Sequence, residues 1–287
     1  MLPPELSQVT IFTTAELRAR GVEQEDVRRA VSKGALNRLK RGWYTAHAST
    51  PAAQWHRLRA LVELKDHPDT VASHHTGAAV LGLPVHRPDW SRIHLMRTDG
   101  GKAQNRAGVI IHERVGDCGV IDAALVAAQT ALFCPVSGLM ALDHALRQEL
   151  TTLADFDRWC ALLGNHAGRG RLRMVRKLAD GRRESPLESR TAYVFDCWGK
   201  SIEPQFDVPG TNYRADGRIR GTRVLVECDG LAKYDEDGAA AREKVREDDI
   251  RALEWEVVRV TTDLLDERVT LAHRVRDAIA RAERNWG

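Results

Sequence analysis

Residues 213–234 contain the pattern of a β-hairpin, and this pattern constrains the fold more than any other stretch. Gly221 and Thr222 separate two runs of strand-compatible residues, and glycine at the first central position suits a two-residue type II′ turn. Counting outward from this loop places Asp216 directly opposite Glu227. The two carboxylates are therefore predicted to be neighbours on adjacent strands.

The second strand of this hairpin has two chemically different faces, because successive side chains point to opposite sides of a strand. One face carries the acids and the other is apolar. The acidic face contains Leu225, Glu227 and Asp229, and the apolar face contains Val224, Val226 and Cys228. We expect the apolar face to be buried against a core.

Two facing carboxylates indicate a divalent cation. Facing residues of an antiparallel pair have Cβ atoms about 4.5–5.5 Å apart, and Mg–O bonds are about 2.0–2.1 Å long. Without a cation, the like charges of Asp216, Glu227 and Asp229 would raise the pKa of at least one of them. A bound Mg²⁺ or Mn²⁺ would remove this conflict. The alternative is that these acids are solvated residues at strand ends.

The flanks of the hairpin carry further motifs in a fixed order. S-P-L-E-S-R precedes it at 185–190, V-E-C-D-G lies within it, and E-K-V-R-E-D and W-E-V-V-R-V-T follow at 243–248 and 255–261. Over about residues 182–285, this series resembles the Vsr-like nuclease domains of the PD-(D/E)XK superfamily. The resemblance implies a restriction-endonuclease-like mixed sheet flanked by helices, and a metal-dependent DNA endonuclease that hydrolyses phosphodiester bonds.

The resemblance also implies roles for individual residues. Asp216, Glu227 and the carbonyl of Cys228 would bind the cation, and Glu188 on the preceding helix would complete the site. A cation in this position would lower the pKa of a bound water and neutralise charge on the phosphate.

The chain departs from the superfamily pattern at one catalytic position. Asp229 lies two residues after Glu227, where the superfamily has a lysine, so Lys233 and Lys244 become the candidates for the missing positive charge. This departure leaves an alternative open, a catalytically inactive DNA-binding regulator or antitoxin of a toxin–antitoxin or phage-defence locus. An active nuclease could serve DNA repair, phage defence or a toxin pair. A scaffold protein without any nucleic-acid role is a further alternative.

Residues 8–47 are predicted to form a helix-turn-helix unit with a wing. Helices are expected over 15–20 and 24–33, separated by Gly21, and the wing over 36–44. Basic residues suited to DNA phosphates lie at the end of the second helix and on the wing: Lys33, Arg38, Lys40 and Arg41. The run R-R-A-V-S-K-G-A-L-N-R-L-K-R-G-W-Y resembles the N-terminal winged helix of AbiEi-type antitoxins. A solvated basic face on a packing module is the alternative.

Residues 48–180 are predicted to form an α-rich middle domain. Strands are expected over 92–96 and 108–114, and apolar helices over 121–133 and 137–149. The run S-H-H-T-G-A-A-V-L-G-L-P resembles the middle region of AbiEi-like proteins. His74 and His75 within it suit close helix packing better than a catalytic pair, because small residues surround them and no acid lies nearby in sequence.

A basic connector over 166–183 precedes the nuclease-like part. Five of its residues are candidates to hold the DNA backbone: Arg169, Arg171, Arg173, Arg176 and Lys177. Each phosphate neutralised would add about 0.9 to the salt slope of duplex binding. The alternative is a solvated helix face.

These patterns together predict a mixed α/β chain with three parts, over 1–47, 48–180 and 184–287. The last part is expected to contain a helix over 239–253, a strand over 255–262 and a helix over 266–284. A net charge of +3 confines any DNA-binding surface to local patches. The five cysteines are widely spread and show no C-x-x-C, which argues against a disulfide framework and against a zinc site. We therefore expect a reducing cytoplasm, with the protein associated with the nucleoid. We expect no membrane segment. DNA is the expected partner, and a homodimer or a toxin or defence partner stays open.

Overall fold

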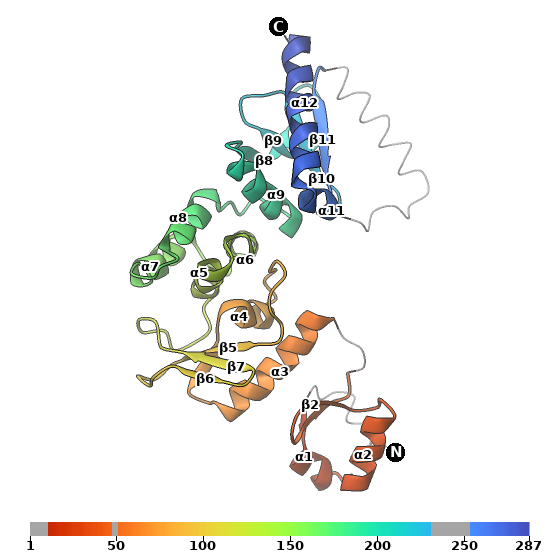
Figure 1. The fold of residues 1–287 in the computed structure, drawn as a ribbon, viewed down its shortest axis with the longest axis vertical. Coiled ribbons are helices and arrows are strands. Elements are labelled where there is room, and N and C mark those ends of the chain that lie inside the picture. Colours follow the sequence, from red (N-terminus) through yellow and green to blue (C-terminus); the bar gives the residue numbers. More distant parts are fainter. Residues whose placement is uncertain (1–10, 48–50, 231–252, 287) are drawn as a thin grey trace.

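A computed structural model describes residues 11–47, 51–230 and 253–286. Helices and three small sheets follow one another along an elongated molecule whose N-terminal unit and C-terminal helix lie at opposite ends (Figure 1). The expected mixed α/β fold class is therefore confirmed. In the described part of the chain, no helix is long and apolar enough to cross a membrane.

The N-terminal unit contains two helices and a three-stranded sheet. Its elements are β1 (Phe12–Thr13), α1 (Thr14–Ala19), α2 (Gln24–Ser32), β2 (Asn37–Lys40) and β3 (Trp43–Thr45), with sheet order β1-β3-β2. Thr13 and Glu16 form a capping box at the start of α1. Gly34, which follows the end of α2, has a φ of +71°. The predicted helices and wing are confirmed to within about two residues.

The small N-terminal sheet is covered on both faces. Phe12, Leu17 and Leu36 belong to the cluster on the α1 and α2 side. On the other side, Ile11 and Leu39 pack against helix α3 (Ala52–Asp66). Helix α3 therefore joins the N-terminal unit to the middle of the molecule through apolar contacts.

The middle sheet has four strands in the order β4-β5-β7-β6. These are β4 (Thr70–Ala72), β5 (Ile93–Arg97), β6 (Gln104–Arg106) and β7 (Val109–His112), and helix α4 (His74–Leu81) follows β4. The central strands β5 and β7 are parallel. Their apolar residues, together with Ala60, form a core between the sheet and α3. The strands predicted over 92–96 and 108–114 are confirmed, whereas β6, which lies between them, was not predicted.

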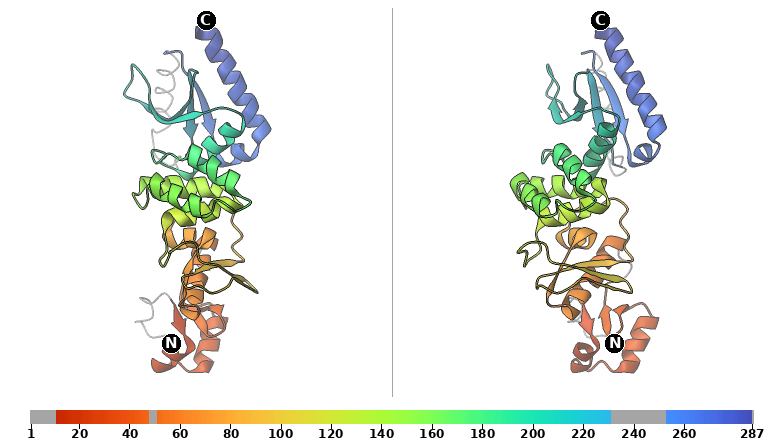
Figure 2. Two further views of the ribbon diagram at one scale, coloured as in Figure 1. Left: turned by 90° about the vertical axis from the view of Figure 1, so that its left-hand side faces the viewer. Right: turned by 60° about the vertical axis from the view of Figure 1, so that its left-hand side comes forward.

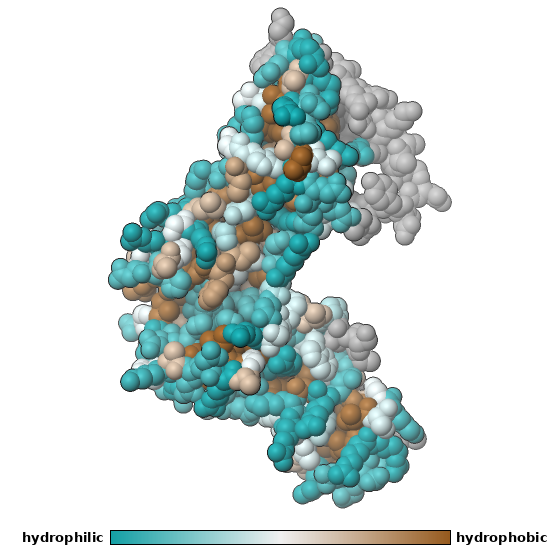
Figure 3. All heavy atoms as spheres, in the orientation of Figure 1, coloured by the Kyte–Doolittle hydropathy of each residue, from teal (hydrophilic) through white to brown (hydrophobic). Residues whose placement is uncertain are grey.

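A helical layer follows the middle sheet. It contains α5 (Ala123–Phe133), α6 (Pro135–Arg147), α7 (Leu153–Leu162) and α8 (Arg169–Leu178). Helix α5 is buried along almost its whole length, which explains its predominantly apolar sequence. Figure 2 shows this layer between the middle sheet and the C-terminal sheet. In Figure 3, apolar residues reach the visible surface around this layer, while hydrophilic residues dominate the N-terminal unit.

The C-terminal part is a four-stranded mixed sheet with helices packed on it. Its elements are α9 (Pro186–Cys197), β8 (Ile202–Asp207), β9 (Arg214–Ile219), β10 (Val224–Cys228), β11 (Glu256–Val260), α11 (Thr262–Asp266) and α12 (Arg268–Trp286). The strand order is β11-β10-β9-β8, with β10 and β11 parallel and the other pairs antiparallel. Strand β8 and helix α11 were not predicted. The helix expected over 239–253 lies outside the described residues.

Candidate functional site: a carboxylate cleft and a basic winged unit

The pairing of β9 with β10 has the predicted register. Leu225 pairs with Arg218 and Val226 with Gly217, so the next step places Glu227 opposite Asp216. The turn differs from the expected type II′ loop, because the N–H of Thr222 donates to the carbonyl of Ile219 over 3.2 Å. Four residues, 220–223, form the loop. The pairing register is the predicted one because the loop 220–223 is centred on the same two residues as the predicted loop, Gly221 and Thr222.

Both faces of β10 are buried at its start. Val224 and Val226 belong to the core under α12, as predicted. Leu225 is equally buried in a second cluster with Ala215 and Trp255. The C-terminal sheet is therefore covered on both sides, and any reactive group must lie near the end of the strands.

The side chains of Asp216 and Glu227 diverge despite facing positions in the register. Asp216 Oδ2 accepts a hydrogen bond from the N–H of Cys228 over 2.7 Å, on the side of α9. Glu227 accepts one from the Tyr213 hydroxyl, and Tyr213 packs with the cluster around Leu225. The two carboxylates are thus directed toward opposite faces of the sheet.

A local break in strand alternation explains this divergence. Ala215 packs in the cluster with Leu225, and Arg218 lies over the Phe206 ring on the same side, 4.4 Å from its centroid. Two residues three apart can share a face only where the alternation is interrupted. On the neighbouring strand, Gln205 has a φ of +54° at the corresponding level. The hydrogen bonds of Asp216 and Glu227 separate the two carboxylates in this conformation, and their sharing of one cation stays a prediction.

Glu188 and Asp216 do face a common cleft. Glu188 is buried, and its Oε2 accepts hydrogen bonds from the Glu184 N–H over 3.0 Å and from Gln205 Nε2 over 2.9 Å. Burial raises the pKa of Glu188, and the nearby charge of Asp216 adds to this rise. A cleft of about 580 Å³ is lined by both acids and by Cys228, between α9 and the helical layer.

The fit of this cleft to Mg²⁺ is incomplete. Mg²⁺ prefers octahedral oxygen coordination, and the cleft offers two of the three predicted carboxylates. Asp229 is partly buried, with its N–H donating to the Val260 carbonyl over 3.0 Å. Lys233 and Lys244 lie outside the described residues. The roles of the Cys228 carbonyl and of the two lysines therefore stay predictions.

The predicted basic residues of the N-terminal unit divide into two groups. Lys33, Arg38 and Arg41 are exposed. Lys40 instead bonds both Glu63 and Asp66 of α3, over 2.9 Å each. These contacts use its ammonium group to join the wing to α3, and a contact of Lys40 with DNA stays a prediction.

The basic connector forms helix α8, and its residues divide in the same way. Arg171 donates to the carbonyl of Leu132. Arg176 pairs with Asp157, and Lys177 with Asp196, both over 2.7 Å. Three of the five predicted DNA contacts therefore hold helices together. Arg169 and Arg173 are exposed, and neither forms an ion pair within residues 11–47, 51–230 and 253–286.

A group of histidines in the middle domain was missed from the sequence. His74, His94 and His112 lie together, and burial lowers the pKa of His94 to about 3 and of His112 to about 4. The same cause holds the pKa of His74 well below its ordinary value. All three imidazoles are neutral at physiological pH. Strand alternation could have indicated this group, because it places His94 in I-H-L-M-R and His112 in V-I-I-H on the faces of their strands opposite to the flanking isoleucines and leucine.

Comparisons with known proteins bear on the N-terminal unit. Residues 2–47 match the family model described as "Transcriptional regulator, AbiEi antitoxin". Two proteins of Mycobacterium tuberculosis, the uncharacterized proteins MT2308 (strain CDC 1551) and Rv2248 (strain H37Rv), are each 26% identical to this chain over 255 residues. The alignment covers 84% of this chain and 90% of each relative.

Among solved structures, the RV2827C protein from Mycobacterium tuberculosis matches with a TM-score of 0.34 and 13% identity, over 60% of this chain and 78% of that chain. The resemblance of residues 182–285 to Vsr-like nucleases gains no support from the comparisons. The N-terminal resemblance is confirmed: residues 2–47 are similar to the transcriptional-regulator domain of AbiEi antitoxins.

Proposed function

We propose that this chain is a DNA-binding transcriptional regulator of the antitoxin type, and that its N-terminal unit contacts duplex DNA. The match of residues 2–47 to a transcriptional-regulator family carries this proposal. The surface of the unit supports it, because exposed basic residues lie along α2 and on the wing. These residues are Arg28, Arg29, Lys33, Arg38 and Arg41.

The packing of the unit determines which side is available to DNA. Helix α3 covers one face of the small sheet, and Lys40 bonds Glu63 and Asp66 on that helix. Lys65 of α3 also lies over the Trp43 ring, 5.4 Å from its centroid. DNA would therefore approach from α2 and the tip of the β2–β3 hairpin, where Gly42 makes the turn with a φ of +81°.

Duplex affinity tests this function. Fluorescence anisotropy would compare a duplex from upstream of the chain's own gene with a scrambled duplex of equal length and composition. We expect tighter binding to the first duplex, and weaker binding to both after Arg28→Ala and Arg41→Ala. Arg276→Ala is the matched control, since it removes the same charge from an exposed position on α12. Equal affinity of the double variant and the control for DNA would contradict the proposal.

A toxin or defence protein is the proposed partner, because an antitoxin acts through a cognate toxin. Co-expression with the neighbouring gene product, followed by size-exclusion chromatography, tests this partner. Co-elution in a defined ratio is expected. The same elution profile would report whether the chain forms a homodimer.

A metal-dependent deoxyribonuclease is the second candidate function. One observation favours it, the position of Glu188 and Asp216 on a common cleft beside a mixed sheet of order β11-β10-β9-β8. Mg²⁺ or Mn²⁺ held there would supply a polarised water for phosphodiester hydrolysis. Glu188, with its raised pKa, would hold or release a proton near that water. The divergence of Glu227 weighs against this candidate.

A further inference from the structure

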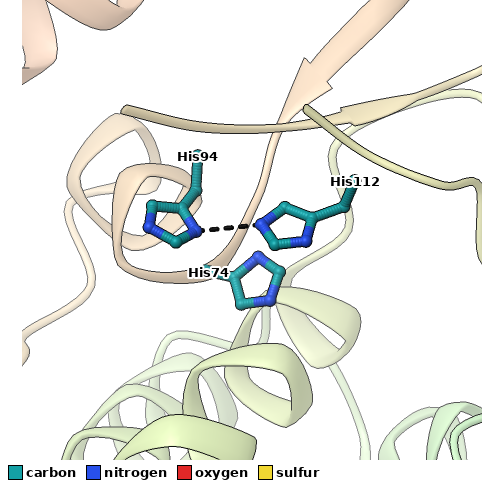
Figure 4. A group of neighbouring side chains, drawn as sticks. All are labelled: His74, His94 and His112. Atoms are coloured by element: carbon teal, nitrogen blue, oxygen red, sulfur yellow. Dashed lines mark hydrogen bonds between the residues drawn. The ribbon is translucent and has the colours of Figure 1, made fainter. Parts of the chain in front are cut away.

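The middle domain brings three histidines from three elements to one point. His74 begins α4, His94 lies in β5, and His112 ends β7. One ligand atom of each lies within 4.8 Å of the others, and no other group of three His, Cys, Asp or Glu residues within 11–47, 51–230 and 253–286 meets this condition. Figure 4 shows the His74 ring beside the other two, with one ring nitrogen turned toward them.

The sheet register explains why two of these residues meet. In the parallel pair β5–β7, His94 is aligned with Ile110 and Met96 with His112. His94 and His112 are therefore diagonal neighbours on one face of the sheet. The opposite face is apolar and packs on α3. The histidine face is directed toward α4 and α5, where Met96 joins the larger core.

The third histidine is held by the start of α4. His74 has a φ of +52°, a left-handed conformation that is uncommon for residues other than glycine. Two backbone contacts fix this turn against β5. The Ser73 N–H donates to the His94 carbonyl over 3.0 Å, and the His94 N–H donates to Thr76 Oγ1 over 2.8 Å. The start of α4 is thus held against β5 by these two hydrogen bonds.

The contact between His94 and His112 brings two potential ligand nitrogens to neighbouring positions. His94 Nδ1 and His112 Nε2 lie 2.9 Å apart, facing each other. In the neutral state, one nitrogen must donate a proton and the other must accept it. If both nitrogens carry lone pairs, a cation between them and His74 satisfies all three at once. Imidazole nitrogens bind Zn²⁺ at about 2.0–2.1 Å.

We propose that His74, His94 and His112 bind one Zn²⁺ ion, with a fourth coordination position open to solvent. The surroundings support an open position, because His112 is partly exposed and Phe133, whose ring contacts that of His74, is 60% exposed. Three protein ligands with a free position are typical of zinc sites that bind a water or a small ligand, whereas structural sites have four protein ligands. Mg²⁺ does not suit this site, since it prefers oxygen ligands.

Direct metal titration tests this site. The full chain is first dialysed against a chelator, and Zn²⁺ is then added in a calorimeter in the presence of a competing chelator. We expect one equivalent to bind at micromolar or lower concentration. Millimolar Mg²⁺ should not compete. Substituting Co²⁺ gives a second readout, because visible absorption bands of a histidine-bound Co²⁺ should appear with the same stoichiometry.

Matched variants decide which residues bind the ion. His94→Ala and His112→Ala should each weaken binding at least about 100-fold, since even changes around a ligand typically cost 10- to 100-fold. His75→Ala is the control, because His75 hydrogen-bonds the Arg92 carbonyl and its ring meets that of His94 edge-on, without belonging to the ligand group. Asp216→Asn controls for the carboxylate cleft. Circular dichroism of each metal-free variant checks that it folds.

The outcomes distinguish a Zn²⁺ site from a metal-free cluster of hydrogen-bonded histidines. Loss of binding in His94→Ala and His112→Ala, with binding kept in His75→Ala and Asp216→Asn, supports the proposal. Absence of Zn²⁺ binding to the wild-type chain, or unchanged binding in both ligand variants, would overturn it in favour of a neutral hydrogen-bonded cluster. Equal loss in His75→Ala would overturn the assigned ligand set.

Discussion

Arg183 Nη1 donates to Asp143 Oδ2 over 2.6 Å, and both side chains are almost completely buried. Asp143 belongs to α6, and Arg183 lies shortly before α9, so the pair joins the helical layer to the C-terminal sheet. Ser189 Oγ and the Asp180 N–H donate to the same carboxylate. A buried polar network, and not a free linker, thus connects the two parts.

Removing the arginine of this pair should destabilise the chain in a pH-dependent way. Burial raises the pKa of Asp143 to about 6 even with Arg183 present. The folded state therefore holds this proton more tightly than the unfolded chain does, and the stability due to this group is lost as pH rises through that value. In Arg183→Met the carboxylate loses its partner, so its pKa should rise further.

We expect Arg183→Met to cost about 3–5 kcal/mol in unfolding free energy near neutral pH, and clearly less at about pH 5, where Asp143 takes up a proton. Urea denaturation at both pH values measures this. Arg182→Met is the control, because Arg182 is exposed and pairs with Asp180 at the surface. A cost for Arg183→Met that is the same at both pH values would contradict the assigned pKa.

Neighbouring basic residues of the wing should have different effects. Lys40→Ala removes the contacts with Glu63 and Asp66, and we expect it to lower stability by about 1 kcal/mol. Arg38→Ala, on the same strand, should leave stability nearly unchanged but weaken DNA binding more than Lys40→Ala does. Thermal unfolding and anisotropy on the two variants check both statements. The opposite order in the DNA assay would show that the α3 contact does not occupy Lys40.

The close approach of α5 and α6 makes a specific stability prediction. A Cβ added at Gly138 would lie 2.6 Å from the Cα of Ala131, which is backbone and cannot turn away. We expect Gly138→Ala to cost about 1–3 kcal/mol or more. Gly170→Ala on α8 is the control, because a Cβ there meets nothing within 4 Å. The control should be neutral or stabilising by up to about 1 kcal/mol, as read from denaturant midpoints.

Nuclease activity, if present, should depend on the two acids that share the cleft. Glu188→Gln and Asp216→Asn should each abolish Mg²⁺- or Mn²⁺-dependent nicking of supercoiled DNA. Asp277→Asn, on the exposed side of α12, should leave it unchanged. The assay includes linear and single-stranded substrates. Absence of cutting on all three, with DNA binding intact, would leave the regulator function alone.

The hairpin shows what the sequence could predict and what it could not. The pairing register of the two hairpin strands was predicted from the position of Gly221, and the pair Val226–Gly217 confirms it. The buried face of the second strand was predicted from alternation, and the burial of Val226 confirms it. The direction of Asp216 did not follow, because a break in alternation depends on the contacts of the neighbouring strand at Gln205. Two residues can thus be aligned in register while their carboxylates lie on different faces.

Charge patterns were ambiguous for a related reason. Lys40 and Arg176 were predicted from the sequence to contact DNA. In the structure they form ion pairs with Glu63 and Asp157, which belong to other elements. A run of basic residues does not reveal which of them meet acids after folding.

The spacing of the histidines along the chain likewise did not indicate that three of them meet in space. His74, His94 and His112 are spread over three elements, so only the sheet topology brings them together. The expectation of no zinc site rested on the cysteines alone, and it took no account of histidine ligands.

The salt dependence of duplex binding tests the central claim most directly. Anisotropy titrations over a range of salt concentrations give the slope of log K against log salt, which reflects the number of phosphates neutralised. With Arg28, Arg38 and Arg41 all changed to alanine, we expect the slope to decrease by about 0.9 for each lost phosphate contact. A slope and an affinity identical to those of the wild-type chain would contradict a DNA-binding role for the N-terminal unit.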